Sequence, residues 1–172
     1  DGHTAYDTLA RKTGNRPQQR CWAHFICGAK DLAKILGEEG EIIHRILKKT
    51  YDSAMAFDHK GTKDDVEQLF HQMKGDLDRQ YKSSKCAKFV KNLLARKDQL
   101  FVFVTNPDVD ATNNAAERAV RPPVVMRKIS GGSRSAKGAE ITQTLMSVSY
   151  TLRLQKKDLL VHGPAILNTS HG

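Results

Sequence analysis

The stretch at residues 42–55 reads IIHRILKKTYDSAM. Its apolar residues recur every three or four positions, which places them on one stripe of an α-helix: Ile42, Ile43, Ile46, Leu47, Tyr51, Ala54 and Met55. A second stripe follows Thr62 and Asp65, a pair typical of a capped helix start: Val66, Leu69, Phe70, Met73, Leu77 and Tyr81. A third segment carries Phe89, Val90, Leu93 and Leu94. Residues 38–95 therefore predict antiparallel helices that bury these stripes in a core.

The segments on either side are shorter and more varied. Residues 19–26 predict a strand that runs into a helix near Ala29, while residues 100–104 fit either a strand or a helix end. A helix is expected from Asn113 or Asn114, kinked or stopped at Pro122 and Pro123. Another is expected at about residues 136–155, and after Leu160 we expect an irregular tail.

Composition narrows the class of protein. The chain has 172 residues and a formal charge of +9, and hydrophobic residues make up 39%, enough for one folded domain. Apolar runs such as residues 100–104 are far shorter than the roughly 20 residues that span a bilayer, and the chain opens without a secretion signal. We therefore expect no membrane partner and a cytoplasmic location.

Basic residues gather in the last third of the chain. Between residues 118 and 156 only Glu140 is acidic, whereas eight residues are basic: Arg118, Arg121, Arg127, Lys128, Arg134, Lys137, Arg153 and Lys156. Such a one-sided distribution favours a polyanionic partner, because each cation near a phosphate releases a condensed counterion. A solvated basic face without a partner is the alternative.

Two short motifs contain residue types that carry chemistry. Cys21, His24 and Cys27 form a C-x-x-H-x-x-C run, but structural zinc needs four ligands, so we interpret these cysteines and Cys86 as free thiols of a reducing compartment. The other motif is Thr112–Pro122, in which Glu117 stands between asparagines and arginines. From the residues alone, Asn114 and Glu117 fit a helix cap better than a catalytic site.

Those motifs, taken with their surroundings, resemble the transposases of the insertion sequence 66 family. The resemblance extends to about Leu160 and rests on six stretches: DGxxAY at 1–6, QRCWAH at 19–24, FVFVTNP at 101–107, TNNAAERAVRP at 112–122, RKISGG at 127–132 and KGAE at 137–140. The Asn-Asn-Ala-Ala-Glu-Arg run is specific to these enzymes.

The resemblance implies an α/β ribonuclease-H-like catalytic domain with an Asp-Asp-Glu triad that binds two Mg²⁺ ions. Asp1 matches the second aspartate and Glu117 the glutamate, and the helical residues between them match the family's insertion. The C-x-x-H element is expected to pack and hydrogen-bond rather than bind metal. The family's first aspartate and first strands lie upstream of this sequence, as do its DNA-binding and zinc-binding regions. What is left is a partial domain, predominantly α.

The expected division follows from this match: residues 1–28 are a partial ribonuclease-H-like core, 29–100 the helical insertion, 101–160 the glutamate helix with the C-terminal part of the core, and 161–172 a tail. The implied function is DNA transposition, the cutting and joining of DNA strands. DNA is the expected partner, and six residues are expected to contact it: Asn113, Asn114, Arg118, Arg121, Arg127 and Lys128.

Two further expectations follow from the missing first aspartate. This chain alone should bind Mg²⁺ poorly and should not be active, because the two-ion site lacks a bridging ligand. The full-length enzyme is expected to form homo-oligomers and to associate with the nucleoid. The alternatives are a non-catalytic basic helical module that binds DNA or transposase subunits, and an inert gene remnant.

Overall fold

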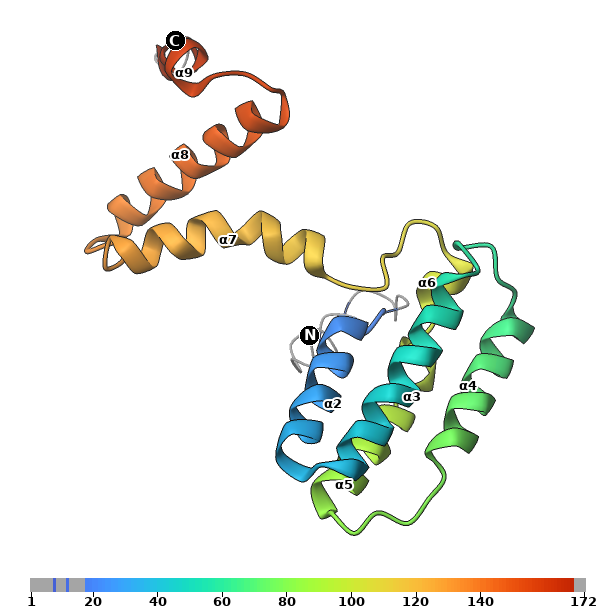
Figure 1. The fold of residues 1–172 in the computed structure, drawn as a ribbon. Coiled ribbons are helices and arrows are strands. Elements are labelled where there is room, and N and C mark those ends of the chain that lie inside the picture. The colour runs from blue at the N-terminus through green and yellow to red at the C-terminus, as the bar shows by residue number, and fades with distance from the viewer. Residues whose placement is uncertain (1–7, 9–11, 13–17, 169–172) are drawn as a thin grey trace. The chain divides into compact units, whose positions relative to one another are not determined.

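A computed structural model describes residues 8, 12 and 18–168 of the chain. The chain divides into two compact units, residues 1–115 and 116–172, which are considered separately below. Secondary structure in the described residues is helical without strands, which confirms a predominantly α chain. Figure 1 shows the elements in order: α2 (Trp22–Leu36), α3 (Glu38–Met55), α4 (Lys63–Leu77), α5 (Ser84–Leu94), the 3-10 turn η1 (Lys97–Gln99), α6 (Val102–Thr105), α7 (Asn114–Ile129), α8 (Ala136–Leu154) and α9 (Leu159–Asn168).

The first unit is a helical bundle in which α3 lies between α2 and α4, and α5 packs on α2 (Figure 1). Its core is built from the apolar stripes that the sequence predicts, together with residues of α2 and of the 100–104 segment. The largest fully buried side chains are Trp22, Phe101, Phe103, Ile43, Leu47, Met73, Leu77, Leu93, Leu100 and Val104. The helical arrangement predicted for residues 38–95 is confirmed.

Gly40 sets how closely α2 and α3 approach each other. Only Gly37 separates the two helices, so they form a tight hairpin. A Cβ atom at Gly40 would overlap the main chain of Leu32 and Ala33, which cannot move aside as the end of a flexible side chain could. The close contact of these helices therefore requires a residue without a side chain at this position.

Polar contacts at the ends of α3 and α4 fix the bundle's loops. Thr62 and Asp65 form a complete capping box at the start of α4, as the sequence predicts. At the start of α3, the Glu39 carboxylate accepts the main-chain N–H groups of Lys82 (2.6 Å) and Ser83 (3.0 Å). These two hydrogen bonds hold the pKa of Glu39 below its ordinary value of 4.5.

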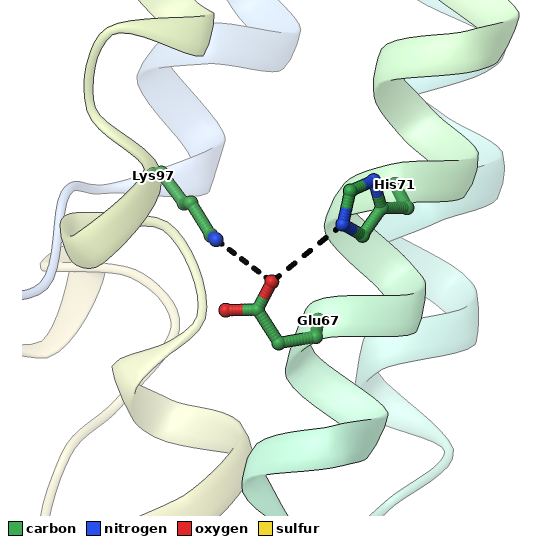
Figure 2. Close-up of polar contacts among 3 residues, drawn as sticks. All are labelled: Glu67, His71 and Lys97. Carbon is green, nitrogen blue, oxygen red and sulfur yellow. Dashed lines mark hydrogen bonds and ion pairs between the residues drawn. The ribbon is translucent and has the colours of Figure 1, made fainter.

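An ion pair joins α4 to the η1 turn (Figure 2). Lys97 Nζ lies 2.7 Å from Glu67 Oε2, and His71 Nε2 lies 3.8 Å from the same oxygen. Lys97 also stands 5.3 Å from the centre of the Phe70 ring, over its face. Because the side chains of Lys97 and Glu67 are both partly exposed to water, this ion pair contributes only about 0.2–1 kcal/mol to stability.

The strand predicted at residues 19–26 is wrong from Trp22 onward, because α2 begins there. Trp22, Phe25, Ile26 and Ala29 lie at the spacing of one helix face, and packing against α3 selects the helix. This helix also crosses the expected division at residues 28 and 29. Residues 100–104, for which strand and helix end were both open, form a turn and the short helix α6.

The second unit consists of α7, α8 and α9, joined by short connections. Gly131 and Gly132 both have positive φ values, 67° and 85°, and form the tight turn after α7. Pro122 and Pro123 do not stop α7, which continues to Ile129. No residue of α7 is buried, so water can satisfy the carbonyl groups that the prolines leave without a donor.

The irregular tail expected after Leu160 is also wrong where the structure describes it, because α9 runs to Asn168. Asp158 Oδ1 accepts the Leu160 N–H at 2.7 Å, and a side-chain acceptor at this position favours a helix start. In the described part of the chain, no helix is long and apolar enough to cross a membrane.

Candidate functional site

The residues that precede α7 are held by the segment that precedes α2. Arg20 N–H donates to Gln99 O (2.7 Å), and Trp22 N–H donates to Ala111 O (3.1 Å). The Trp22 indole Nε1–H donates to Leu100 O at 2.6 Å, and its side chain is fully buried. Residues 20–22 and 99–111, far apart in the sequence, are therefore joined by a series of hydrogen bonds inside the first unit.

The side chain of Gln19 adds further hydrogen bonds to this junction. Its side-chain Nε2 donates to Leu100 O (2.9 Å), and its Oε1 accepts the Phe103 N–H (3.2 Å). Arg20, only 4% exposed, donates from Nε to Gln99 Oε1 at 2.7 Å. The Gln-Arg-Cys-Trp run is thus a docking segment for residues 99–113, consistent with the packing and hydrogen-bonding role expected of the C-x-x-H element.

Asn113 lies at the end of this junction, directly before α7. Its main-chain N–H donates to the Cys21 sulfur at 3.4 Å. Its side-chain Oδ1 is buried without a hydrogen-bond partner among the described residues, and such an acceptor costs about 1–3 kcal/mol. A group that is costly for folding is a candidate for a functional role.

Helix α7 carries the glutamate singled out by the sequence. It begins at Asn114, so Asn114 lies in the first turn instead of at the cap position, and Glu117 follows within the helix. The side chains of Asn114 and Glu117 are exposed. The observed helix start therefore lies one residue earlier than the capping interpretation of Asn114 expects.

The predicted basic residues of α7 fall on two faces. In a regular helix each residue advances by about 100°, so Arg118, Arg121 and Lys128 lie within about 80° of one another and Arg127 lies roughly opposite Arg118. All four side chains are exposed. Three of these four basic residues thus share one face of α7, and the fourth, Arg127, belongs to a different surface.

That different surface is a groove of about 700 Å³ between α7 and α8. Arg127 and Pro123 line it from α7, and Met146, Tyr150 and Arg153 line it from α8. The sequence analysis placed Arg153 in the basic region but not in the site. The helical spacing of Met146, Tyr150 and Arg153, at intervals of three and four, is the signal that places them on one face.

The candidate metal ligands are only partly within the described residues. Asp1 lies outside them, so its distance from Glu117 stays a prediction. The described residues contain no group of three or more His, Cys, Asp or Glu side chains that could hold a metal ion. Glu117 offers the hard carboxylate oxygens that Mg²⁺ prefers, but one carboxylate does not form a two-ion site.

The C-x-x-H-x-x-C residues occupy different environments on α2. Cys21 is 4% exposed at the helix start, whereas His24 and Cys27 are exposed. All three cysteines of the chain, Cys86 included, are free thiols. Burial raises the pKa of the Cys86 thiol above its usual value.

Comparison with known proteins now identifies the chain. A family model described as "Transposase IS66 family" matches residues 1–141, which include the docking segment, Asn113 and the glutamate of α7. The chain belongs to this family. The resemblance stated from the sequence motifs is thereby confirmed.

Two relatives in Sinorhizobium fredii (strain NBRC 101917 / NGR234) are similar to this IS66-family chain. The uncharacterized protein y4qI is 26% identical over 178 residues, which cover 93% of the chain and 33% of that protein. The uncharacterized protein y4jO is 35% identical over 66 residues, which cover 38% of the chain and 21% of that protein. The chain thus spans about a third of the length of the first relative. No solved structure matches it significantly.

Proposed function

We propose that this chain supplies part of the catalytic domain of a DNA transposase that cuts and joins DNA strands. The observation that carries the proposal is the composition of α7: Glu117 lies in the first part of the helix, and Arg118, Arg121 and Lys128 share one exposed face. A carboxylate beside a row of cations is suited to a metal-assisted reaction on a phosphodiester, and the family match covers this helix.

The proposed domain is ribonuclease-H-like, with Asp1 and Glu117 as the second and third carboxylates of an Asp-Asp-Glu triad. These two side chains would hold Mg²⁺, since both are hard oxygen ligands. When bound, a Mg²⁺ pair would stabilise the attacking and leaving oxygens of the phosphodiester. Arg118, Arg121 and Lys128 would hold the DNA backbone by charge and by hydrogen bonds to phosphate oxygens.

Charge supports DNA as the substrate. Residues 116–172 contain nine Lys and Arg against three Asp and Glu, so this unit holds most of the chain's excess charge. Arg127 would add a contact from the groove side of α7. Asn114 is exposed and able to approach the DNA, while Asn113 is half-buried within the first unit. A polyanion is the partner that best matches this distribution.

The test of catalysis uses the full-length protein, including any residues that precede Asp1. Purified transposase with Mg²⁺ should cut and join DNA carrying the ends of its element, and Glu117→Gln should abolish both reactions. Glu140→Gln is the matched control, because Glu140 is an exposed carboxylate on α8 of the same unit. Equal activity in the Glu117→Gln variant and the wild type would refute the metal-ligand role. The 172-residue chain alone should be inactive.

The second candidate function, a non-catalytic module that binds DNA, is favoured by the basic second unit alone. It predicts that the wild-type full-length protein does not cut DNA, so that Glu117→Gln has no reaction to abolish. The DNA-binding test is common to both functions. Arg118→Gln, Arg121→Gln and Lys128→Gln together should reduce the slope of log K against log salt by about 3. Lys30→Gln, Lys48→Gln and Lys88→Gln, three exposed lysines of the first unit, form the control with the same change in charge.

A further inference from the structure

Cys21 occupies the N-cap position of α2 but does not cap that helix. Residues at this position normally direct a side-chain oxygen to the N–H groups of the first turn, which is why Ser, Thr, Asp and Asn are preferred. The Cys21 side chain makes no such hydrogen bond. Its sulfur instead accepts the N–H of Asn113, 92 residues later in the chain.

The start of α2 makes a second hydrogen bond to the segment that contains Asn113. Trp22, the next residue, donates its N–H to Ala111 O at 3.1 Å. The start of α2 therefore binds residues 111 and 113 together, one through a carbonyl group and the other through an amide. Ala111 and Cys21 are 7% and 4% exposed, so both acceptors are largely shielded from water.

Burial also limits what the Cys21 thiol can do. A nucleophilic or redox-active cysteine has to meet its substrate, and a thiol that is 4% exposed does not. His24 and Cys27, three and six residues later on α2, are exposed, and the described residues hold no three-ligand cluster that would include the thiol. The remaining use of the sulfur is its contact with Asn113.

We propose that Cys21 is a positioning residue for the start of α7. Its sulfur holds the Asn113 amide, Asn113 directly precedes Asn114, and Glu117 follows one turn into the helix. The consequence for catalysis rests on the proposed function of Glu117, whereas the consequence for local structure does not. A carboxylate that binds metal must be held to a fraction of an ångström, so fixing the residue directly before its helix affects the rate of the reaction.

Amide hydrogen exchange in the 172-residue chain tests the structural part. Cys21→Ala should speed exchange at Asn113 by about threefold to tenfold, the increase expected when one hydrogen bond of modest strength is lost. Cys86→Ala is the matched control, because that thiol is also fully buried but lies on α5. It should change exchange at Asn113 by less than about twofold, even where it lowers overall stability. Equal effects of the two variants would overturn the proposal.

A conservative variant separates the sulfur contact from simple packing. Cys21→Ser keeps a side-chain acceptor in place of the sulfur, and it should restore at least half of the protection lost at Asn113 in Cys21→Ala. If the serine variant exchanges as fast as the alanine variant, the acceptor is not what holds Asn113. A stoichiometric zinc ion found by metal analysis of the wild-type chain, and lost in Cys21→Ala, would also overturn the proposal in favour of a metal ligand.

The full-length protein then tests the link to catalysis. Cys21→Ala should lower the rate of strand cleavage at saturating DNA and leave the Kd for DNA unchanged, because no cation has been altered. A rise in Kd with an unchanged rate would contradict positioning of Glu117. If the wild-type protein does not cleave DNA at all, the proposed function fails, while the exchange experiment still decides whether Cys21 holds Asn113.

Discussion

Replacing Trp22 with Phe tests the junction between residues 19–22 and 99–111. The indole Nε1–H donates to Leu100 O at 2.6 Å, and the side chain is fully buried beside Tyr51 and Phe101. Phe keeps the aromatic packing but loses the donor, which costs about 1 kcal/mol. The smaller ring also leaves a void of roughly 40 Å³, worth about 1 kcal/mol. We therefore expect Trp22→Phe to lower the free energy of unfolding by about 2 kcal/mol.

The estimate stays this low because Leu100 O keeps a second donor. Gln19 Nε2 lies 2.9 Å from the same carbonyl oxygen, so the Phe variant does not leave it unpaired. In the double variant Trp22→Phe with Gln19→Ala, both donors are gone and a buried acceptor is left without a partner. The double variant should therefore lose about 1–3 kcal/mol more than the sum of the two single variants.

The measurement is equilibrium unfolding in urea, followed by far-ultraviolet circular dichroism. Fluorescence is unsuitable because Trp22 is the sole tryptophan of the chain. Additivity of the two substitutions within about 0.5 kcal/mol would refute the shared-carbonyl reasoning, since independent sites add to within that margin. A loss above about 4 kcal/mol for Trp22→Phe alone would show that the cavity, not the hydrogen bond, dominates.

The remaining predictions concern caps, acid and proline. Thr62→Ala should destabilise the first unit by about 1 kcal/mol in urea unfolding, while Thr62→Ser, which keeps the hydroxyl, should cost much less. The pKa of Glu39 is held below 4.5, so the stability that its carboxylate contributes is complete above pH 4.5 and is lost as the pH falls through the folded-state pKa. The difference in unfolding free energy between the wild type and Glu39→Gln should therefore shrink on acidification. A difference that grows would contradict this assignment. Pro122→Ala with Pro123→Ala should slow amide exchange along α7, because replacing each proline raises the local stability of the helix by up to about 3 kcal/mol. Unchanged exchange would show that the prolines do not lower the stability of this helix.

Local signals in the sequence were the most informative about the fold. The Thr62 and Asp65 capping box needs only four residues to form, and it is present as predicted. The stripes of α3 and α4 are buried as predicted because one strong period of apolar residues leaves a single face to bury. Met55, placed on the same stripe, is 43% exposed because it is the last residue of α3.

Other features depended on contacts that no local pattern contains. Residues 22–26 carry aromatic and branched side chains that favour a strand, but packing on α3 makes them helical. The Cys21 contact with Asn113 joins residues 92 positions apart, and neither residue type indicates it. Within the candidate site, the cations of α7 are exposed, but their contacts with DNA and the Asp1 ligand stay predictions.

The close approach of α2 and α3 at Gly40 has a consequence for the history of this protein's relatives. Any replacement there, even by alanine, places a methyl group on the main chain of Leu32 and Ala33. A mutation at this codon therefore forces the main chains of α2 and α3 to shift away from each other, whichever residue replaces the glycine. Among descendants of one transposon, this position should record selection for a folded transposase, and copies that have lost the glycine should be those no longer maintained as functional genes.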